Sequence, residues 1–148
     1  MSALEFLDSN ILLYAYDLRD VRKQEIAKDL LRKGVAGECV ISVQVLAEVA
    51  SALLHKVTPA STPDMVEAIL DLLAPIPTFN PDADTVKRAV QTCARYGVHF
   101  YDGMILAAAE RAGCSKVWSE DLNAGQDYFG ITVENPFTSN LPHKSTKG

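Results

Sequence analysis

Short apolar runs alternate with longer segments of helical periodicity along this 148-residue chain. The apolar runs predict strands at residues 4–7, 39–41, 76–79, 116–119 and 131–133. Prolines 75 and 77 favour an edge position for the third of these strands. Because strands that alternate with helices form βαβ units, we expect one α/β domain, with a mostly parallel central sheet between two layers of helices.

Capping residues place the helices between these strands. An Asp or Ser precedes several of the amphipathic segments, and Thr62-Pro63-Asp64 combines an N-cap, a first-turn proline and a first-turn acid. The expected helices cover residues 11–16, 20–34, 42–54, 62–74, 81–96 and 104–112. We expect the domain to span residues 1–137, and the polar residues 138–148 to form a flexible tail.

The composition excludes several classes of protein. No apolar run reaches the roughly 20 residues of a membrane-spanning helix, and the first residues lack the pattern of a secretory signal, so we expect a cytoplasmic protein without a membrane partner. Cys39, Cys93 and Cys114 are too scattered for a thiolate zinc site or a disulfide framework. The net charge of −5 disfavours a simple basic nucleic-acid-binding module.

Two acids follow predicted strands. Asp8 comes directly after the first strand, and Asp121 comes just after the strand that ends near residue 119. In open parallel sheets the ligand site lies beyond the carboxyl ends of the strands, so both acids are expected at that edge. Taken singly, each also has a structural explanation, as a helix cap for Asp8 and as a turn residue for Asp121.

Two further acids interrupt apolar helices. Glu48 is the only charged residue between Cys39 and Leu54, and Asp102 is the only acid in the first part of a largely apolar segment. Asp102 alone is explained by a helix dipole, but a lone acid in an apolar helix such as Glu48 needs a partner. We therefore expect both to face the same sheet edge as the strand-end acids.

Four converging carboxylates repel one another unless a cation lies between them. Oxygen ligands without thiolates or paired histidines favour Mg²⁺, or Mn²⁺, over zinc or copper. Such ions support phosphodiester hydrolysis, because they activate water and neutralise phosphate oxygens. The residues thus predict a metal-dependent phosphodiesterase.

Four segments in order, residues 6–14, 42–48, 100–105 and 117–122, resemble the motifs of the PIN-domain ribonucleases and, among them, of the VapC-like toxins of bacterial toxin–antitoxin pairs. By this resemblance Asp8, Glu48, Asp102 and Asp121 are the catalytic acids, and Asp8 and Asp102 are the direct Mg²⁺ ligands. Asn10 and Ser119 match polar positions that hold hydrogen bonds in the site. The resemblance further implies a PIN-like fold, an RNA substrate, a cognate antitoxin and a homodimer.

Two other functions remain open from the residues alone. The first is a non-catalytic PIN-like module that binds protein or RNA, since a fold does not secure a function. The second is an aspartate-based phosphatase or phospho-accepting domain, although Asp8-Ser9-Asn10 lacks the second acid that such phosphatases use.

Basic residues also occur on the helix predicted at residues 20–34. They are interspersed with acids, and Asp29 is spaced to pair with Lys33. We therefore expect a solvated surface there, and not a phosphate-binding one. The basic residues are Arg22, Lys23, Lys28, Arg32 and Lys33.

Overall fold

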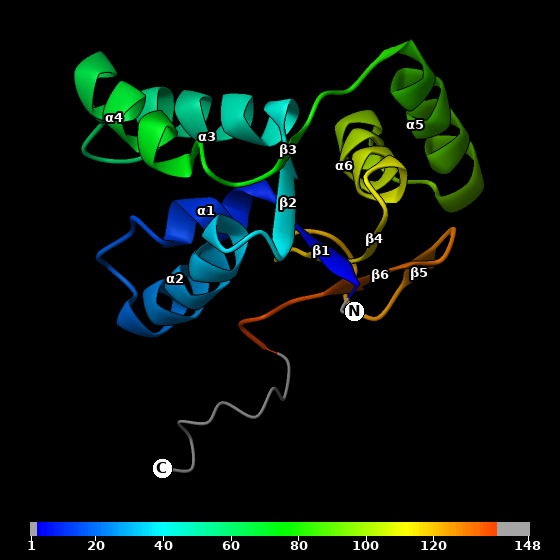
Figure 1. Ribbon diagram of the computed structural model, residues 1–148, viewed down its shortest axis with the longest axis horizontal. Helices are drawn as coiled ribbons and strands as arrows, with labels where there is room; N and C mark the ends of the chain where they lie inside the picture. The colour runs from blue at the N-terminus through cyan, green and yellow to red at the C-terminus, as the bar shows by residue number, and fades with distance from the viewer. Residues whose placement is uncertain (1–2, 139–148) are drawn as a thin grey trace.

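The structure, a computed structural model, describes residues 3–138. Strands and helices alternate along this part of the chain (Figure 1). The strands are β1 (Leu4–Leu7), β2 (Cys39–Ser42), β3 (Thr78–Phe79), β4 (Cys114–Trp118), β5 (Asp127–Tyr128) and β6 (Ile131–Glu134). The helices are α1 (Ser9–Tyr14), α2 (Val21–Val35), α3 (Val43–His55), α4 (Pro63–Leu73), α5 (Ala83–Tyr96) and α6 (Phe100–Arg111).

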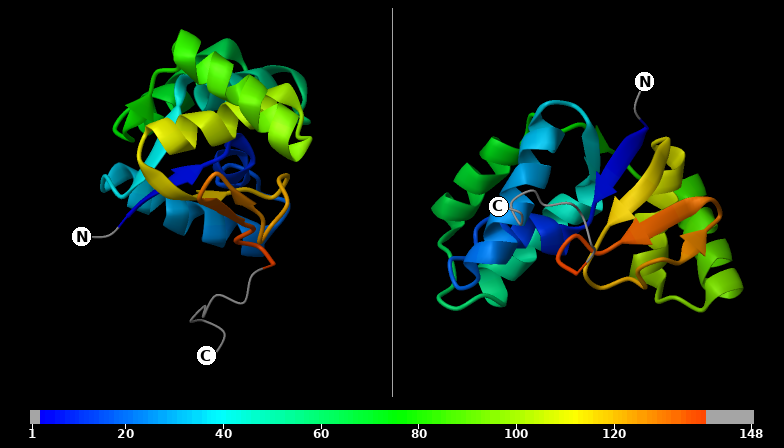
Figure 2. Two further views of the ribbon diagram at one scale, coloured as in Figure 1. Left: turned by 90° about the vertical axis from the view of Figure 1, so that its right-hand side faces the viewer. Right: turned by 90° about the horizontal axis from the view of Figure 1, so that it is seen from below.

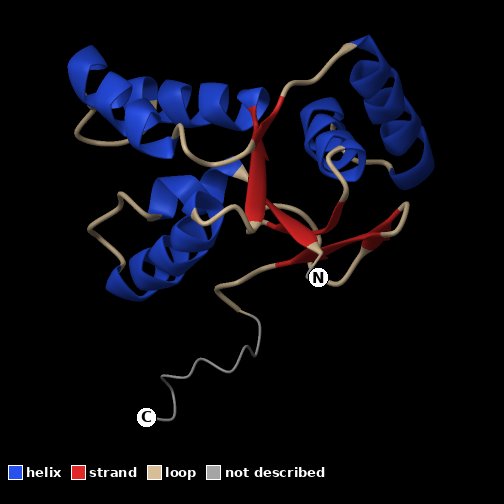
Figure 3. Ribbon diagram, in the orientation of Figure 1, coloured by secondary structure: helices blue, strands red, loops and turns tan. Residues whose placement is uncertain are grey.

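The strands form one sheet in the order β3-β2-β1-β4-β6-β5 (Figure 3). Neighbouring strands are parallel except β5 and β6, which pair antiparallel. In the centre, Phe6 of β1 lies beside Val40 of β2 and Val117 of β4. The predicted α/β class and the edge position of β3 are therefore confirmed.

Helices cover both faces of the sheet. Figures 1 and 2 show α1 and α2 on one side and α5 and α6 on the other. Helix α2 packs on β2, α6 packs on β4, and α3 and α4 form a pair that packs on α1 through α3. The interior between these layers is apolar, with fully buried side chains from every central strand. Among them are Phe6, Leu7, Ile41, Val117 and Val133.

Several predicted elements differ from the structure. Helix α1 begins two residues earlier than predicted, and β3 begins two residues later. Helix α6 begins at Phe100 because His99 caps it, so it contains one turn more than its apolar pattern indicates. Strand β4 begins at Cys114 and ends at Trp118. Strand β5 lies where the sequence indicates only a loop, because two residues are too few to show a strand period. This strand pairs with β6 across a turn in which Phe129 and Gly130 both have positive φ.

None of the helices within residues 3–138 is long and apolar enough to cross a membrane. The predicted tail lies outside the described residues, apart from Thr138.

Candidate active site

Asp8 lies at the junction of β1 and α1. Its Oδ1 accepts a hydrogen bond from the backbone N–H of Ser9 at 2.8 Å, so the same carboxylate caps the helix. Its Oδ2 accepts one from the Ser119 hydroxyl at 2.8 Å. The side chain is only 5% exposed, and burial raises the pKa of Asp8 to about 6, against the lowering effect of these hydrogen bonds. The cap and the site position of Asp8 are therefore compatible.

Ser119 connects Asp8 to the segment that follows β4. Its hydroxyl is fully buried, and while donating to Asp8 it accepts hydrogen bonds from the backbone N–H groups of Asp121 at 3.1 Å and Leu122 at 3.3 Å. These bonds shape the chain so that Asp121 turns back toward the end of β1. The Ser119 hydroxyl therefore holds the Asp8 carboxylate and the backbone around Asp121 in place.

Asn10, in α1, also connects Asp8 to the segment that follows β4. Its Nδ2 donates to Asp121 Oδ2 at 3.1 Å and to Asp8 Oδ2 at 3.3 Å. Its Oδ1 accepts a hydrogen bond from the backbone N–H of Glu120 at 3.0 Å. One amide thus contacts two of the four candidate acids and holds the loop that carries Asp121.

The other two acids come from helices α6 and α3. Asp102 lies in the first turn of α6 and is half-buried, and Glu48 lies in the second turn of α3. Burial raises the pKa of Asp102, the nearby His99 opposes the rise, and the negative charges of Asp121 and Glu48 add to it. The charges of Glu48 and Asp121 also raise the pKa of Asp8. The charges of Glu48 and Asp121 thus act on both Asp8 and Asp102.

The position of Asp102 depends on the glycine that follows it. A Cβ atom on Gly103 would lie 2.8 Å from the backbone oxygen of Ala89, so α6 approaches α5 closely beside the acid. Only glycine allows this approach without movement of the helices.

The donor set fits a hard divalent cation. The four acids supply only carboxylate oxygens, and no side-chain hydrogen bond within residues 3–138 occupies the Asp102 carboxylate, which leaves its oxygens available. The acids do not form a closed centre, because no three metal-binding side chains in the described part of the chain lie close enough together to hold an ion. The four carboxylates are therefore suitable ligands for Mg²⁺ or Mn²⁺, but they lie too far apart in this structure to surround an ion.

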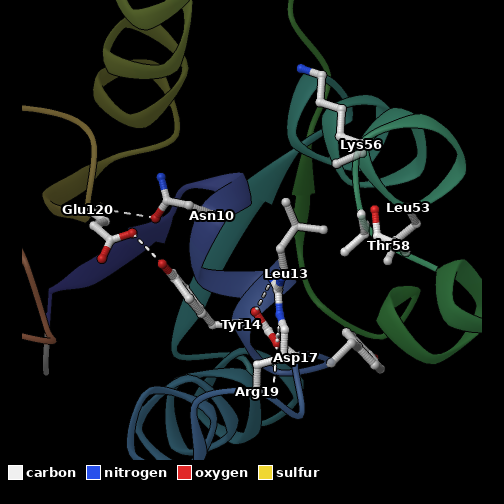
Figure 4. A pocket seen from close by; sticks show the side chains of 12 residues that line it. Asn10, Leu13, Tyr14, Asp17, Arg19, Leu53, Lys56, Thr58 and Glu120 are labelled. Atoms are coloured by element: carbon white, nitrogen blue, oxygen red, sulfur yellow. Dashed lines mark hydrogen bonds and ion pairs between the residues drawn. The ribbon is translucent and has the colours of Figure 1, made fainter. Parts of the chain in front are cut away.

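Three side chains that the sequence does not single out as site residues support this arrangement, namely Tyr14, Lys23 and Glu120; Figure 4 shows Tyr14 and Glu120. Tyr14 donates a hydrogen bond to Glu120 Oε1 at 2.7 Å, and Lys23 Nζ lies 2.6 Å from Glu120 Oε2. This cluster links α1 and α2 to the loop after β4. Spacing offers a signal for Tyr14, which follows Asn10 by one helical turn, but none for Lys23, whose partner lies 97 residues away.

The expected solvated surface on α2 is therefore only partly correct. Lys23 is half-buried against the Glu120 cluster, and Lys33 pairs with Glu5 at 2.9 Å and not with Asp29. Asp29 instead pairs with Arg32 on the exposed surface. The tertiary partners of the two lysines explain the difference.

An open cavity of about 340 Å³ lies beside the site and is drawn in Figure 4, although none of the four acids lines it. It shares Asn10 and Glu120 with the site, and Leu13, Leu53 and Lys56 line it farther out. Asp17 and Arg19 also line it, so a ligand that approaches from this side meets both apolar surface and charged side chains.

The family model described as the PIN domain matches residues 6–126. The chain belongs to the PIN domain family. No curated protein sequence matches it.

Solved structures share the fold of this PIN domain. A toxin–antitoxin complex from Klebsiella pneumoniae is 22% identical, with a TM-score of 0.65 and coverage of 91% of this chain and 98% of the other. VapBC from Salmonella typhimurium, bound to DNA, is 19% identical, with a TM-score of 0.67 and coverage of 91% and 99%. VapC20 from Mycobacterium tuberculosis, a sarcin–ricin-loop-cleaving toxin, is 19% identical, with a TM-score of 0.63 and coverage of 79% and 91%.

Proposed function

We propose that this PIN domain is a Mg²⁺- or Mn²⁺-dependent endoribonuclease and the toxin of a toxin–antitoxin pair. The observation that carries the proposal is the hydrogen-bonded group of Asp8, Asn10, Ser119 and Asp121 at the carboxyl ends of β1 and β4. The charges of Glu48 and Asp121, which act on both Asp8 and Asp102, support it. The similarity of the fold to toxins, one of which cleaves the sarcin–ricin loop, supports RNA as the substrate.

Asp8 and Asp102 would bind the cation directly, and Glu48 and Asp121 would complete its surroundings. A bound ion would supply Lewis acidity and an activated water for in-line hydrolysis of a phosphodiester. Ser119 and Asn10 orient the Asp8 carboxylate, since each donates a hydrogen bond to its Oδ2. Asn10 orients Asp121 in the same way.

The partners follow from the same proposal. The neighbouring structures include complexes with antitoxins, so we propose that a cognate antitoxin binds this chain and blocks cleavage. We further propose that the toxin is a homodimer and acts in the cytoplasm, where its RNA substrates are found.

The test uses purified protein free of any partner. It is incubated with labelled structured RNAs and a single-stranded DNA control in Mg²⁺, Mn²⁺ or EDTA. Asp8→Asn and Asp102→Asn should abolish cleavage with the fold intact, whereas Asp71→Asn, which changes an exposed acid on α4, should leave cleavage unchanged.

The outcomes separate the alternatives. Discrete RNA cuts that require metal and disappear in both site variants support the proposal. Full activity in both folded variants would refute the assignment of the metal ligands. Binding of RNA without cleavage of any substrate would favour a non-catalytic module, and a trapped phospho-aspartate at Asp8 would favour a phosphatase.

A further inference from the structure

Gln44 joins the two helices that carry Glu48 and Asp102. It lies in the first turn of α3, four residues before Glu48 and therefore on the same helical face. Its Nε2 donates to Glu48 Oε2 at 2.9 Å and to the backbone oxygen of Tyr101 at 3.2 Å. Because Tyr101 directly precedes Asp102, one amide group connects the carboxylate on α3 to the first turn of α6.

The other half of the Gln44 amide has no partner. Its Oε1 is buried and accepts no hydrogen bond from the residues that the structure describes. A buried polar atom without a partner is unfavourable, and an apolar side chain of similar length would avoid this cost. The orientation of the amide is thus set by what its N–H groups bind.

Glu48 depends on this contact for its orientation. Within residues 3–138, the bond from Gln44 is the side-chain hydrogen bond that its carboxylate receives. A glutamate has three rotatable side-chain bonds, so without this contact the carboxylate samples several directions. The bond restricts Glu48 and, through Tyr101, fixes its place relative to Asp102.

We propose that Gln44 is a positioning residue that preorients Glu48 for binding of the divalent cation and holds α3 against the first turn of α6. This inference rests on the proposed function, since it assigns Glu48 to the metal site. Residues that orient the ligands of a metal typically change metal affinity by about 10–100-fold when they are replaced.

Direct Mn²⁺ binding to the metal-free protein, measured by calorimetry and by electron paramagnetic resonance of free Mn²⁺, tests the proposal without reference to activity. Gln44→Met preserves the length of the side chain but removes its donor, and we expect Mn²⁺ affinity about 10-fold weaker. Gln44→Ala, which cannot crowd its neighbours, should weaken it similarly. Gln91→Leu, on the exposed surface of α5, is the matched control and should leave affinity unchanged.

Urea unfolding of the metal-free protein separates positioning from simple packing. Gln44→Met removes an unpaired buried oxygen but also the two hydrogen bonds that Nε2 donates, and because these effects oppose each other its metal-free stability should change little while its affinity falls. In a Glu48→Gln background, Gln44→Met should cause no further loss of affinity, since the carboxylate that it orients is already absent.

Each result decides the question. If the unmodified protein binds Mn²⁺ and both Gln44 variants bind it with the same affinity, the inference is overturned and the proposed function is unaffected. Loss of affinity that matches a loss of metal-free stability also overturns it, because Gln44 is then a packing residue. Failure of the unmodified protein to bind Mn²⁺ overturns both this inference and the metal-dependent function.

Discussion

Replacement of Asp8 by asparagine should change how the stability of the metal-free protein depends on pH. Burial raises the pKa of Asp8 from 3.8 to about 6, and the charges of Glu48 and Asp121 contribute to the rise. Between about pH 4 and pH 6 the folded protein therefore keeps a proton on Asp8 that the unfolded chain has already released. The free energy of unfolding falls as the pH rises through this window. A shift of about 2 pKa units corresponds to about 3 kcal/mol at the acidic limit.

The assay is urea unfolding in EDTA at two values of pH. Between about pH 4.5 and about pH 7.5 this one group should reduce the unfolding free energy by about 2 kcal/mol, since the unfolded carboxyl is already mostly ionised at the lower pH. Asp8→Asn should lack that part of the decline. The asparagine can also change the unfolding free energy by altering the hydrogen bond from Ser119, but this cost is the same at both pH values. It therefore cancels when the change in stability between the two pH values is compared. An equal decline in both proteins would refute the electrostatic reasoning, and added Mg²⁺ should stabilise only the original protein at the higher pH.

Three further changes test the packing around the site by urea unfolding. Gly103→Ala should cost roughly 1–3 kcal/mol, because the new methyl group meets the Ala89 oxygen; an unchanged midpoint would show that α5 and α6 separate freely. Tyr14→Phe should cost about 1 kcal/mol through the lost bond to Glu120, and a neutral result would mean that the loop after β4 is held without it. Arg32→Ala should change stability by less than about 0.5 kcal/mol, because both members of its ion pair are exposed.

The sequence predicts the elements that have a clear hydrophobic period. Helix α3 and the central strands are long enough to show their pattern, and the caps at Asp20 and Thr62 lie where the side chains accept backbone hydrogen bonds. Strand β5 has two residues and no readable period, and the first turn of α6 is set by the His99 cap instead of by apolar spacing. Local pattern therefore predicts long elements better than short ones.

The site was predictable to a similar degree. The sequence places Asp8 and Asp121 at strand ends, and a parallel sheet brings strand ends to one edge, which is where the structure has them. It does not identify Lys23 or Glu120, because their contact depends on how α2 packs against a loop formed 97 residues later. It also gives no distance between the acids, which depends on helix packing at contacts such as that of Gly103.

The pairing of β1 with β4 has a consequence for the order of synthesis. Asp8 is made early, but the hydroxyl that binds it belongs to Ser119, 111 residues later, and Ser119 in turn donates its backbone N–H to Glu134 of β6. A chain released before β4 contains neither this hydroxyl nor Asp121, and β1 lacks a central neighbour. Prematurely terminated products thus contain an incomplete set of acids, so a cell that makes this protein is exposed to its proposed activity only after nearly the whole domain has left the ribosome.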